Sequence, residues 1–339
     1  MSVSVKKATL MVAAGCAAAA LAACQSEPAQ DDGQQKDVFM GNASAQPSPP
    51  SAGVAGKVYP SAAVTELDAT GDLLALRTAS ELRVGTLDEI TAGKGSSYPL
   101  DDACGDVSAN NRTFVIACGD EIRLITESGE NSVGTDFPAT AAAVTTGGEI
   151  IAGSREDNTV RVLRDGQTVS EFTVARETDR ILAAPRGEGR PDAVVRLNNA
   201  DTTVQDLDWQ SGRQGGTLRA GLGVGGAATG PEGMVLAADA TGNQVLVYNT
   251  EDIIRLQMTA PVAESPWAVA WELPEQLAWV SSTAVNKAEG YSLSTGVPIK
   301  HAGFATVADA QSMVALPDGT LVLASATGDG IQVVSPSDR

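Results

Sequence analysis

Aromatic side chains are scarce in this sequence, at 4% of 339 residues, and His301 is the only histidine. A hydrophobic core must therefore be built from Val, Leu, Ile and Ala, which suits many short strands. A Ser-His-Asp triad would have to use His301, and no G-x-S-x-G motif supports one. Outside the first residues, no segment keeps a helical hydrophobic period over about eleven residues, which argues against a helical fold.

Basic residues are also few, since 23 Lys and Arg face 42 Asp and Glu, and the formal net charge is −19 at pH 7. Such a surface repels nucleic-acid phosphates and anionic lipid headgroups. We therefore expect no nucleic-acid partner. Solubility outside the cell explains the charge, and attraction of cations or of a basic partner is the alternative.

The first residues have the pattern of a targeting segment, although their apolar stretch, residues 8–20, is too short to span a bilayer. Leu21-Ala22-Ala23-Cys24 resembles the bacterial lipobox. This resemblance implies that residues 1–23 are a signal peptide and that Cys24 carries the lipid. An ordinary secretory signal and a short membrane anchor are the alternatives. We expect a chain anchored by lipid to the cell membrane, on its extracytoplasmic face.

Residues 24–56 are rich in Gln, Asp, Ser, Pro and Gly and almost lack β-branched and aromatic side chains. A segment of this kind buries too little apolar area to offset its chain entropy. We expect a flexible linker that holds the following domain, residues 57–339, away from the membrane.

Only four cysteines occur in the sequence. Cys16 lies in the signal and Cys24 is the expected lipidation site, so Cys104 and Cys118 remain as two thiols in an oxidising compartment. We therefore expect a structural disulfide between Cys104 and Cys118. A metal site is the weaker interpretation, because the chain has no C-x-x-C pair.

The segment Pro231–Asp252 contains a turn, an apolar strand, a small polar loop and an alternating strand, and the rest of the chain repeats it. Gly147–Arg164 and Pro317–Ser335 are clear copies. The turn recurs seven times at a spacing of roughly 36 to 45 residues. Because such a period with about four short strands per unit is typical of a β-propeller, we predict an all-β, seven-bladed β-propeller.

The last unit contains only three strands, and the strand at Lys57–Pro60 precedes the first blade without a blade of its own. We predict that this N-terminal strand completes the seventh blade, which closes the ring and removes an exposed edge. Cys104 and Cys118 then flank the first hairpin of the second blade, where cross-strand neighbours come within disulfide reach.

The units resemble the YVTN/YncE-like and related lactonase-like or quinoprotein-like seven-bladed propellers. The resemblance lies in an apolar strand, a small Asn/Asp/Gly loop and a V-x-V-x-D-like strand with a Thr-Gly turn. Matching pieces are Leu236–Asn249, Thr203–Gly212 and Leu321–Ser335. The Gly-His and Trp-Asp signatures of WD40 blades are absent. The resemblance implies the propeller fold and a ligand site in the central funnel.

Residues just before or at the innermost strand of each blade are expected to surround the mouth of this funnel. They are Asp101, Asp102, Thr140, Asp179, Arg180, Trp267, Asp309 and Gln311. In this arrangement Arg180 would be a cation among carboxylates, and Trp267 a platform for stacking. The alternative is a set of solvated rim residues, with Trp267 packed between blades.

Acidic and amide side chains also occupy the loops between the second and third strands, as at Asp157, Asp201, Asp239 and Asp329. Oxygen ligands of this kind suit Ca²⁺, but no complete calcium loop is present and turn geometry explains these residues. We therefore expect no cofactor, with Ca²⁺ as the alternative.

Together these features favour a non-enzymatic binding or scaffold protein at the cell envelope, with a protein, a glycan or a small molecule as its ligand. The alternative function is an envelope enzyme of the lactonase or hydrolase type, with a metal in the central funnel.

Overall fold

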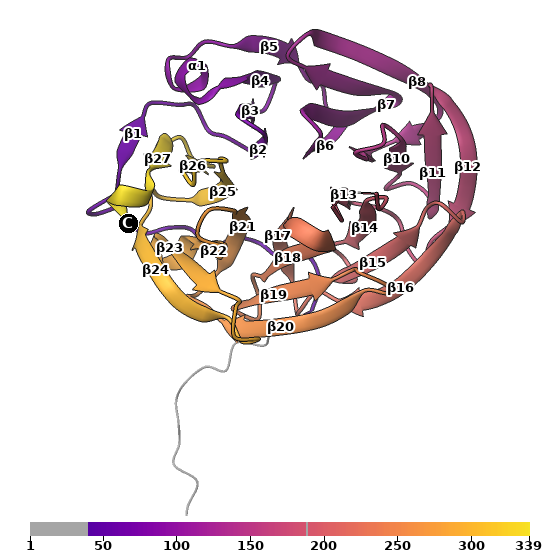
Figure 1. The fold of residues 1–339 in the computed structure, drawn as a ribbon. Coiled ribbons are helices and arrows are strands. Elements are labelled where there is room, and N and C mark those ends of the chain that lie inside the picture. The colour runs from indigo at the N-terminus through magenta and orange to yellow at the C-terminus, as the bar shows by residue number, and fades with distance from the viewer. Residues whose placement is uncertain (1–39, 188) are drawn as a thin grey trace, which may run out of the picture. The chain divides into compact units, whose positions relative to one another are not determined.

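Seven antiparallel sheets are arranged around a common axis in the computed structural model, which describes residues 40–187 and 189–339 (Figure 1). The innermost strands of neighbouring blades contact one another in a complete ring. The seven-bladed propeller predicted from the repeats is thus confirmed. The predicted signal peptide and Cys24 lie outside the described residues.

Each blade follows the chain from the axis outward. Blade 1 contains β2 (Glu66–Thr70), β3 (Leu73–Arg77), β4 (Glu81–Thr86) and β5 (Ser96–Pro99), and blade 2 contains β6 (Cys104–Asn110), β7 (Thr113–Thr126) and β8 (Gly129–Ala139). Blade 3 contains β9 (Ala141–Val144), β10 (Ile150–Gly153), β11 (Thr159–Arg164) and β12 (Gln167–Thr173), and blade 4 contains β13 (Arg180–Ala184), β14 (Ala193–Asn198), β15 (Thr203–Asp208) and β16 (Arg213–Arg219).

The remaining blades have the same order. Blade 5 contains β17 (Val224–Thr229), β18 (Met234–Asp239), β19 (Gln244–Asn249) and β20 (Arg255–Pro261), and blade 6 contains β21 (Pro266–Glu272), β22 (Leu277–Ser282), β23 (Lys287–Ser292) and β24 (Ile299–Ala305). Blade 7 contains β25 (Ala310–Ala315), β26 (Leu321–Ser325), β27 (Ile331–Val334) and β1 (Lys57–Tyr59).

Among the described residues, short helices lie in connections between strands and after the last strand, β27. The helix α1 (Leu87–Thr91) joins β4 to β5 and begins with a capping box formed by Thr86 and Glu89. Three 3₁₀ turns are η1 (Pro231–Gly233), η2 (Thr283–Val285) and η3 (Pro336–Asp338). None of these elements has the length and apolarity needed to cross a membrane.

Blade 2 differs from the expected four strands. The segments predicted as its second and third strands form one continuous strand, β7, whose first part pairs with β6 and whose second part pairs with β8. Cys118 is the last residue paired with β6 and the next residue, Gly119, already pairs with Ala139 of β8, which leaves no room for the polar loop found in the other blades.

The ring closes as predicted, because β1 pairs antiparallel with β27 and places Lys57 opposite Val333 and Tyr59 opposite Ile331. Figure 1 shows the indigo N-terminal strand beside the yellow C-terminal strand. The chain then continues from β1 into blade 1. Blade 7 is therefore joined covalently to blade 1 as well as to blade 6, and its outer edge is paired.

Apolar clusters fill the spaces between neighbouring blades. Leu74 and Leu76 of blade 1 pack with Val322 and Ile331 of blade 7, for example. Small residues make room for the few aromatic ones. A Cβ atom on Gly290 would lie 2.8 Å from the ring of the fully buried Trp279, so only glycine fits at this position.

Residues 41–56 have no helix or strand, yet they are hydrogen-bonded to the propeller, and we call them the N-terminal strap. Ser48 accepts a hydrogen bond from Asp309 N at 2.7 Å and donates one to the Thr283 carbonyl at 2.7 Å. Asn286 Nδ2 donates to the Pro49 carbonyl at 2.6 Å, and the strap borders a hollow of about 440 Å³ beside Phe304. This part of the expected linker is thus attached to blades 5, 6 and 7.

The predicted disulfide joins Cys104 and Cys118, which face each other across β6 and β7.

We expect the double substitution Cys104→Ser and Cys118→Ser to lower the free energy of unfolding by about 2–4 kcal/mol, because the crosslink restricts the unfolded chain. Urea denaturation of the wild type and the variant measures this difference. Reductant should lower the wild-type midpoint and leave that of the variant unchanged. Equal midpoints for the reduced and the oxidised wild type would argue against a stabilising bond.

Candidate functional site

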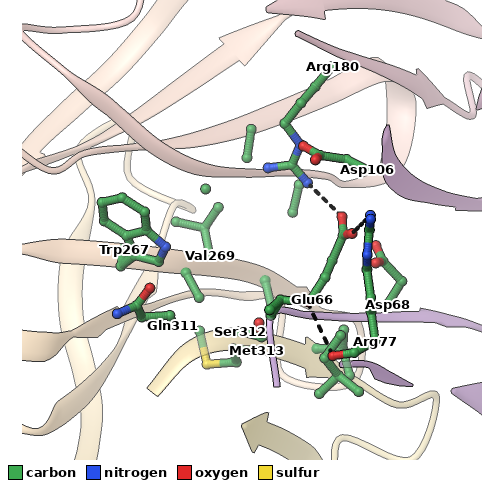
Figure 2. Close-up of a pocket in the computed structure, with 18 of the residues that line it drawn as sticks. Glu66, Asp68, Arg77, Asp106, Arg180, Trp267, Val269, Gln311, Ser312 and Met313 are labelled. Carbon is green, nitrogen blue, oxygen red and sulfur yellow. Dashed lines mark hydrogen bonds and ion pairs between the residues drawn. The ribbon is translucent and has the colours of Figure 1, made fainter. Parts of the chain in front are cut away.

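A cavity of about 630 Å³ lies along the propeller axis, between the innermost strands of blades 1, 2, 4, 5, 6 and 7. Its two walls differ in character, as Figure 2 shows. Charged side chains from blades 1 to 4 gather on one side. Trp267, Val269, Gln311 and Met313 from blades 6 and 7 lie on the other. The cavity therefore offers an amphipathic surface to a ligand.

The charged wall is a network of ion pairs. Arg180 contacts Asp106 at 3.1 Å and Glu66 at 3.7 Å. Arg77 contacts Glu66 at 3.5 Å and donates to the carbonyls of Cys104 and Gly105. Arg155 contacts Asp106 at 3.6 Å. Every arginine that lines the cavity thus has a carboxylate partner.

Alternation along β2 explains why two acidic residues of blade 1 reach this wall. In Glu66-Leu67-Asp68, the residues at the first and third positions line the cavity. Leu67 between them packs into the core between blades and is 5% exposed. Side chains on a strand alternate between faces, so a charged-apolar-charged pattern at an innermost strand directs both carboxylates toward the axis.

A β-bulge places Asp106 in the cavity. The pairing of β6 with β7 shifts between Cys104 and Val107, so that Gly105 and Asp106 lie opposite the single residue Ala117. A Cβ atom on Gly105 would lie 1.7 Å from the carbonyl oxygen of Thr140, so the bulge requires glycine there. Bulges redirect side chains, and this one turns Asp106 toward Arg180.

The same irregularity occurs near the start of three other innermost strands. The pairing shifts in β17, in β21 and in β25. The residues within these shifts include Trp267 and Gln311, and they line the cavity. These irregularities therefore place Trp267 and Gln311 on the neutral wall.

The pKa of Asp68 is raised to about 7, chiefly because the carboxyl group is buried. Arg180 and Arg77 lower this pKa, whereas the nearby charge of Asp106 raises it. Burial also raises the pKa of Glu66 well above its usual value, and Asp106 and Asp68 add to this effect. The charged wall can therefore take up or release a proton near neutral pH.

Asp68→Asn is expected to remove part of the pH dependence of stability. Because the folded-state pKa of Asp68 is raised to about 7, the free energy of unfolding falls as pH rises from about 4 to 7. Asparagine cannot ionise, so the variant should be more stable than the wild type by about 1–3 kcal/mol at pH 8 and nearly equal to it at pH 4.

Urea denaturation between pH 4 and 8 tests this prediction. Asp102→Asn is the matched control, since Asp102 is exposed and lies outside the cavity. A difference between Asp68→Asn and the wild type that is the same at every pH would contradict the prediction.

The structure brings three of the eight predicted funnel residues, Arg180, Trp267 and Gln311, to the cavity wall. The other five lie around it. Asp179 contacts Arg155 at 3.2 Å and Thr140 accepts from Arg155 N, so both hold the cation that lines the cavity. Asp309 binds the strap through Ser48. Asp101 and Asp102 lie in the exposed turn before β6, where Asp101 accepts from Ala103 N.

Five charged residues of the wall were not among the predicted ones, namely Glu66, Asp68, Arg77, Asp106 and Arg155. The predicted residues were those that precede or begin each innermost strand. Asp68 could have been found from the sequence, because it is a charged residue at the third position of an innermost strand.

The acidic side chains in the loops between the second and third strands mostly stabilise turns. Asp239 Oδ1 accepts hydrogen bonds from the backbone of Leu222, Gly223 and Gly242. Asp157 accepts from Thr159 N, and Asp201 pairs with Arg176. In residues 40–187 and 189–339, no group of three or more His, Cys, Asp or Glu is arranged to hold a metal.

No description of a known protein family matches this sequence, and no curated protein matches it. Solved structures show the fold. One chain of the crystal structure of the mitotic checkpoint complex has a TM-score of 0.63 at 14% identity and covers 93% of this chain and 98% of its own length. The WD40 β-propeller domain of Doa1 has a TM-score of 0.58 at 13% identity and covers 84% of this chain and 97% of its own. At these identities the likeness concerns the fold alone.

Proposed function

We propose that this chain is a non-enzymatic binding protein, anchored by lipid at Cys24 to the extracytoplasmic face of the cell membrane. Its propeller would present the central cavity to a ligand at the envelope. The observation that carries the binding function is the amphipathic cavity, with ion-paired charges on one wall and Trp267 on the other. We also propose that the chain belongs to the YVTN/YncE-like propellers, which the repeated turn and strand segments support.

Binding in the cavity is tested by thermal denaturation with mixtures of small, water-soluble envelope compounds. Gln311→Trp fills the cavity from the neutral wall, since Gln311 lines the cavity and is half-buried, and Trp267→Ala removes the stacking surface. We expect at least one mixture to raise the melting temperature of the wild type but not that of a folded cavity variant. Shifts that are equal in the wild type and both variants would place binding elsewhere and contradict the proposal.

The anchor is tested by expressing the full chain and Cys24→Ala in a bacterial host. The lipobox Leu21-Ala22-Ala23-Cys24 supports lipid attachment at Cys24. The unaltered chain should fractionate with membranes and carry a diacylglyceryl mass on Cys24, whereas Cys24→Ala should be released into the soluble fraction. Identical fractionation of the two chains would contradict the anchor.

A protein ligand is a second form of the same proposal. One solved structure with this fold is a chain of the mitotic checkpoint complex. For this chain the likeness supports only the idea that a propeller rim can hold a protein, and a protein partner should compete with small ligands of the cavity.

An envelope hydrolase is the alternative function, and the raised pKa of Asp68, about 7, is the observation that favours it. A carboxyl group of this kind suits general acid–base catalysis near neutral pH. Hydrolysis of chromogenic esters and lactones, with and without Ca²⁺ or a chelator, tests it. Activity that is lost in Asp68→Asn would support the enzyme, and activity equal in the variant would contradict this role of Asp68.

A further inference from the structure

We propose that the central cavity selects a cationic amphiphile, a small molecule with a protonated amine or guanidinium on an apolar, preferably aromatic, body. The inference rests on the proposed binding function and names the ligand class for the same cavity. Four features of the walls support it, namely an unpaired carboxylate, arginines that are already paired, unpartnered polar atoms and an aromatic wall.

Asp68 is the unpaired carboxylate of the charged wall. Among the described residues it has no ion pair within 4.0 Å, and its Oδ2 atom is buried without a hydrogen-bond partner. Leaving a buried acceptor unpaired is unfavourable, and a cationic donor relieves this cost most strongly. Asp68 also lines the cavity, so it is the carboxylate of the wall that we expect a ligand ammonium to pair with.

The arginines of the wall argue against an anionic ligand. Arg77 and Arg180 both contact Glu66, and Arg155 and Arg180 both contact Asp106. An anion would have to replace one of these carboxylates. A cation needs no such exchange, and the net charge of −19 favours its approach.

Two more polar atoms of the cavity residues lack partners. Asn199 Oδ1 is a buried acceptor and Trp271 Nε1 is a buried donor, and both residues line the cavity together with Asp68. Pairing with either atom would add to the affinity of a ligand that carries a donor or an acceptor on its body. The indole of Trp267 supplies apolar surface to the cavity (Figure 2), and a cation near an indole face gains further attraction.

Binding of a cation should release a proton. Asp68 faces Arg77 from β3 and Arg180 from β13, together with Glu66 from its own strand and Asp106 from β6. Burial holds the pKa of Asp68 at about 7, and a bound ammonium would lower it. At pH 6.5 part of the protein is protonated at Asp68, so a cation displaces that proton, whereas an anion would favour its retention.

Three probes of similar shape test the charge preference in isothermal titration calorimetry with the full chain. Tryptamine is cationic, tryptophol is neutral and indole-3-acetate is anionic. We expect tryptamine to bind about tenfold more tightly than tryptophol, and indole-3-acetate to bind more weakly than both. Titrations at pH 6.5 in two buffers of different ionisation enthalpy should show proton release with tryptamine alone.

Asp68→Asn keeps the shape of the side chain and removes its charge. It should reduce the affinity for tryptamine about tenfold, abolish proton release and leave tryptophol binding unchanged. If the variant fails to fold, the proton count of the wild type still tests the proposal. Tighter binding of tryptophol or indole-3-acetate would overturn the cationic class while the cavity remains a binding site. No binding of tryptamine would also overturn the class, and the proposed function is then judged separately by the cavity-filling variants.

Discussion

Arg339→Ala is expected to lower the free energy of unfolding by about 3–5 kcal/mol, because it leaves the buried carboxylate of Glu272 without its cation. Arg339 donates to Glu272 through Nη1 at 2.7 Å and Nη2 at 3.2 Å, and the two side chains are 3% and 0% exposed. Glu272 also accepts from Trp279 Nε1 at 2.8 Å, and the guanidinium carbon of Arg339 lies 5.0 Å from the centroid of the Trp279 ring. The pair joins the end of the chain to blade 6.

Urea denaturation measures this loss, and two further variants separate its causes. Arg213→Ala is the matched control, because Arg213 is 72% exposed in its pair with Asp208 and should cost less than about 1 kcal/mol. The double variant Arg339→Met and Glu272→Met removes both charges and should recover much of the stability. A loss under about 1 kcal/mol for Arg339→Ala alone would contradict the assigned role of the pair.

Removing β1 is expected to lower the free energy of unfolding by about 2–4 kcal/mol, since several backbone hydrogen bonds to β27 are lost. The loss also exposes the edge of β27 and cuts the covalent link between blade 7 and blade 1. The apolar contacts between these blades, as of Leu74 with Val322, would remain. A chain that begins at Pro60 should therefore still fold, but melt at a lower temperature and associate through the free edge.

A second truncation isolates the effect of β1 from that of the N-terminal strap. A chain that begins at Gly56 keeps β1 and lacks the hydrogen bonds of Ser48 and Pro49. Thermal denaturation and light scattering of both truncations, against a chain that begins at Met40, give the two contributions. Equal melting of the chains that begin at Gly56 and at Pro60 would show that β1 does not stabilise the ring.

The fold could be predicted from the sequence because the blades repeat at a regular period, which the turn residues and the apolar segments mark. The sequence was also sufficient for ring closure, since the seventh unit lacked one strand and Lys57–Tyr59 supplied a spare one. The disulfide followed from the position of Cys104 and Cys118 around one hairpin.

The cavity walls could be predicted only in part, because a bulge changes the direction of a side chain without changing the hydrophobic pattern. Trp267 and Gln311 were found through their place at the start of innermost strands. Asp106 reaches the cavity through a bulge that depends on the space available to Gly105 beside Thr140, which is a tertiary contact. Asp68 was visible in the alternation of β2, but the sequence does not show that it lacks a partner.

The attachment of the N-terminal strap to the propeller could not be predicted from the sequence. A composition poor in apolar residues predicted a flexible linker, since such a segment buries little hydrophobic area of its own. Its backbone and small polar side chains instead pair with loop residues that come much later in the chain, as Ser48 does with Asp309. Ser265 and Asp309, which hold the strap, precede the cavity residues Trp267 and Gln311 by two positions.

The central claim is that the axial cavity is the ligand site of this propeller, and crystallographic soaking with a library of small fragments tests it most directly. We expect bound fragments to gather between Trp267 and Asp68, with amines over-represented among them. Fragments that occupy the hollow beside Pro49 and Phe304, or the outer surfaces, and leave the axial cavity without density would contradict the claim.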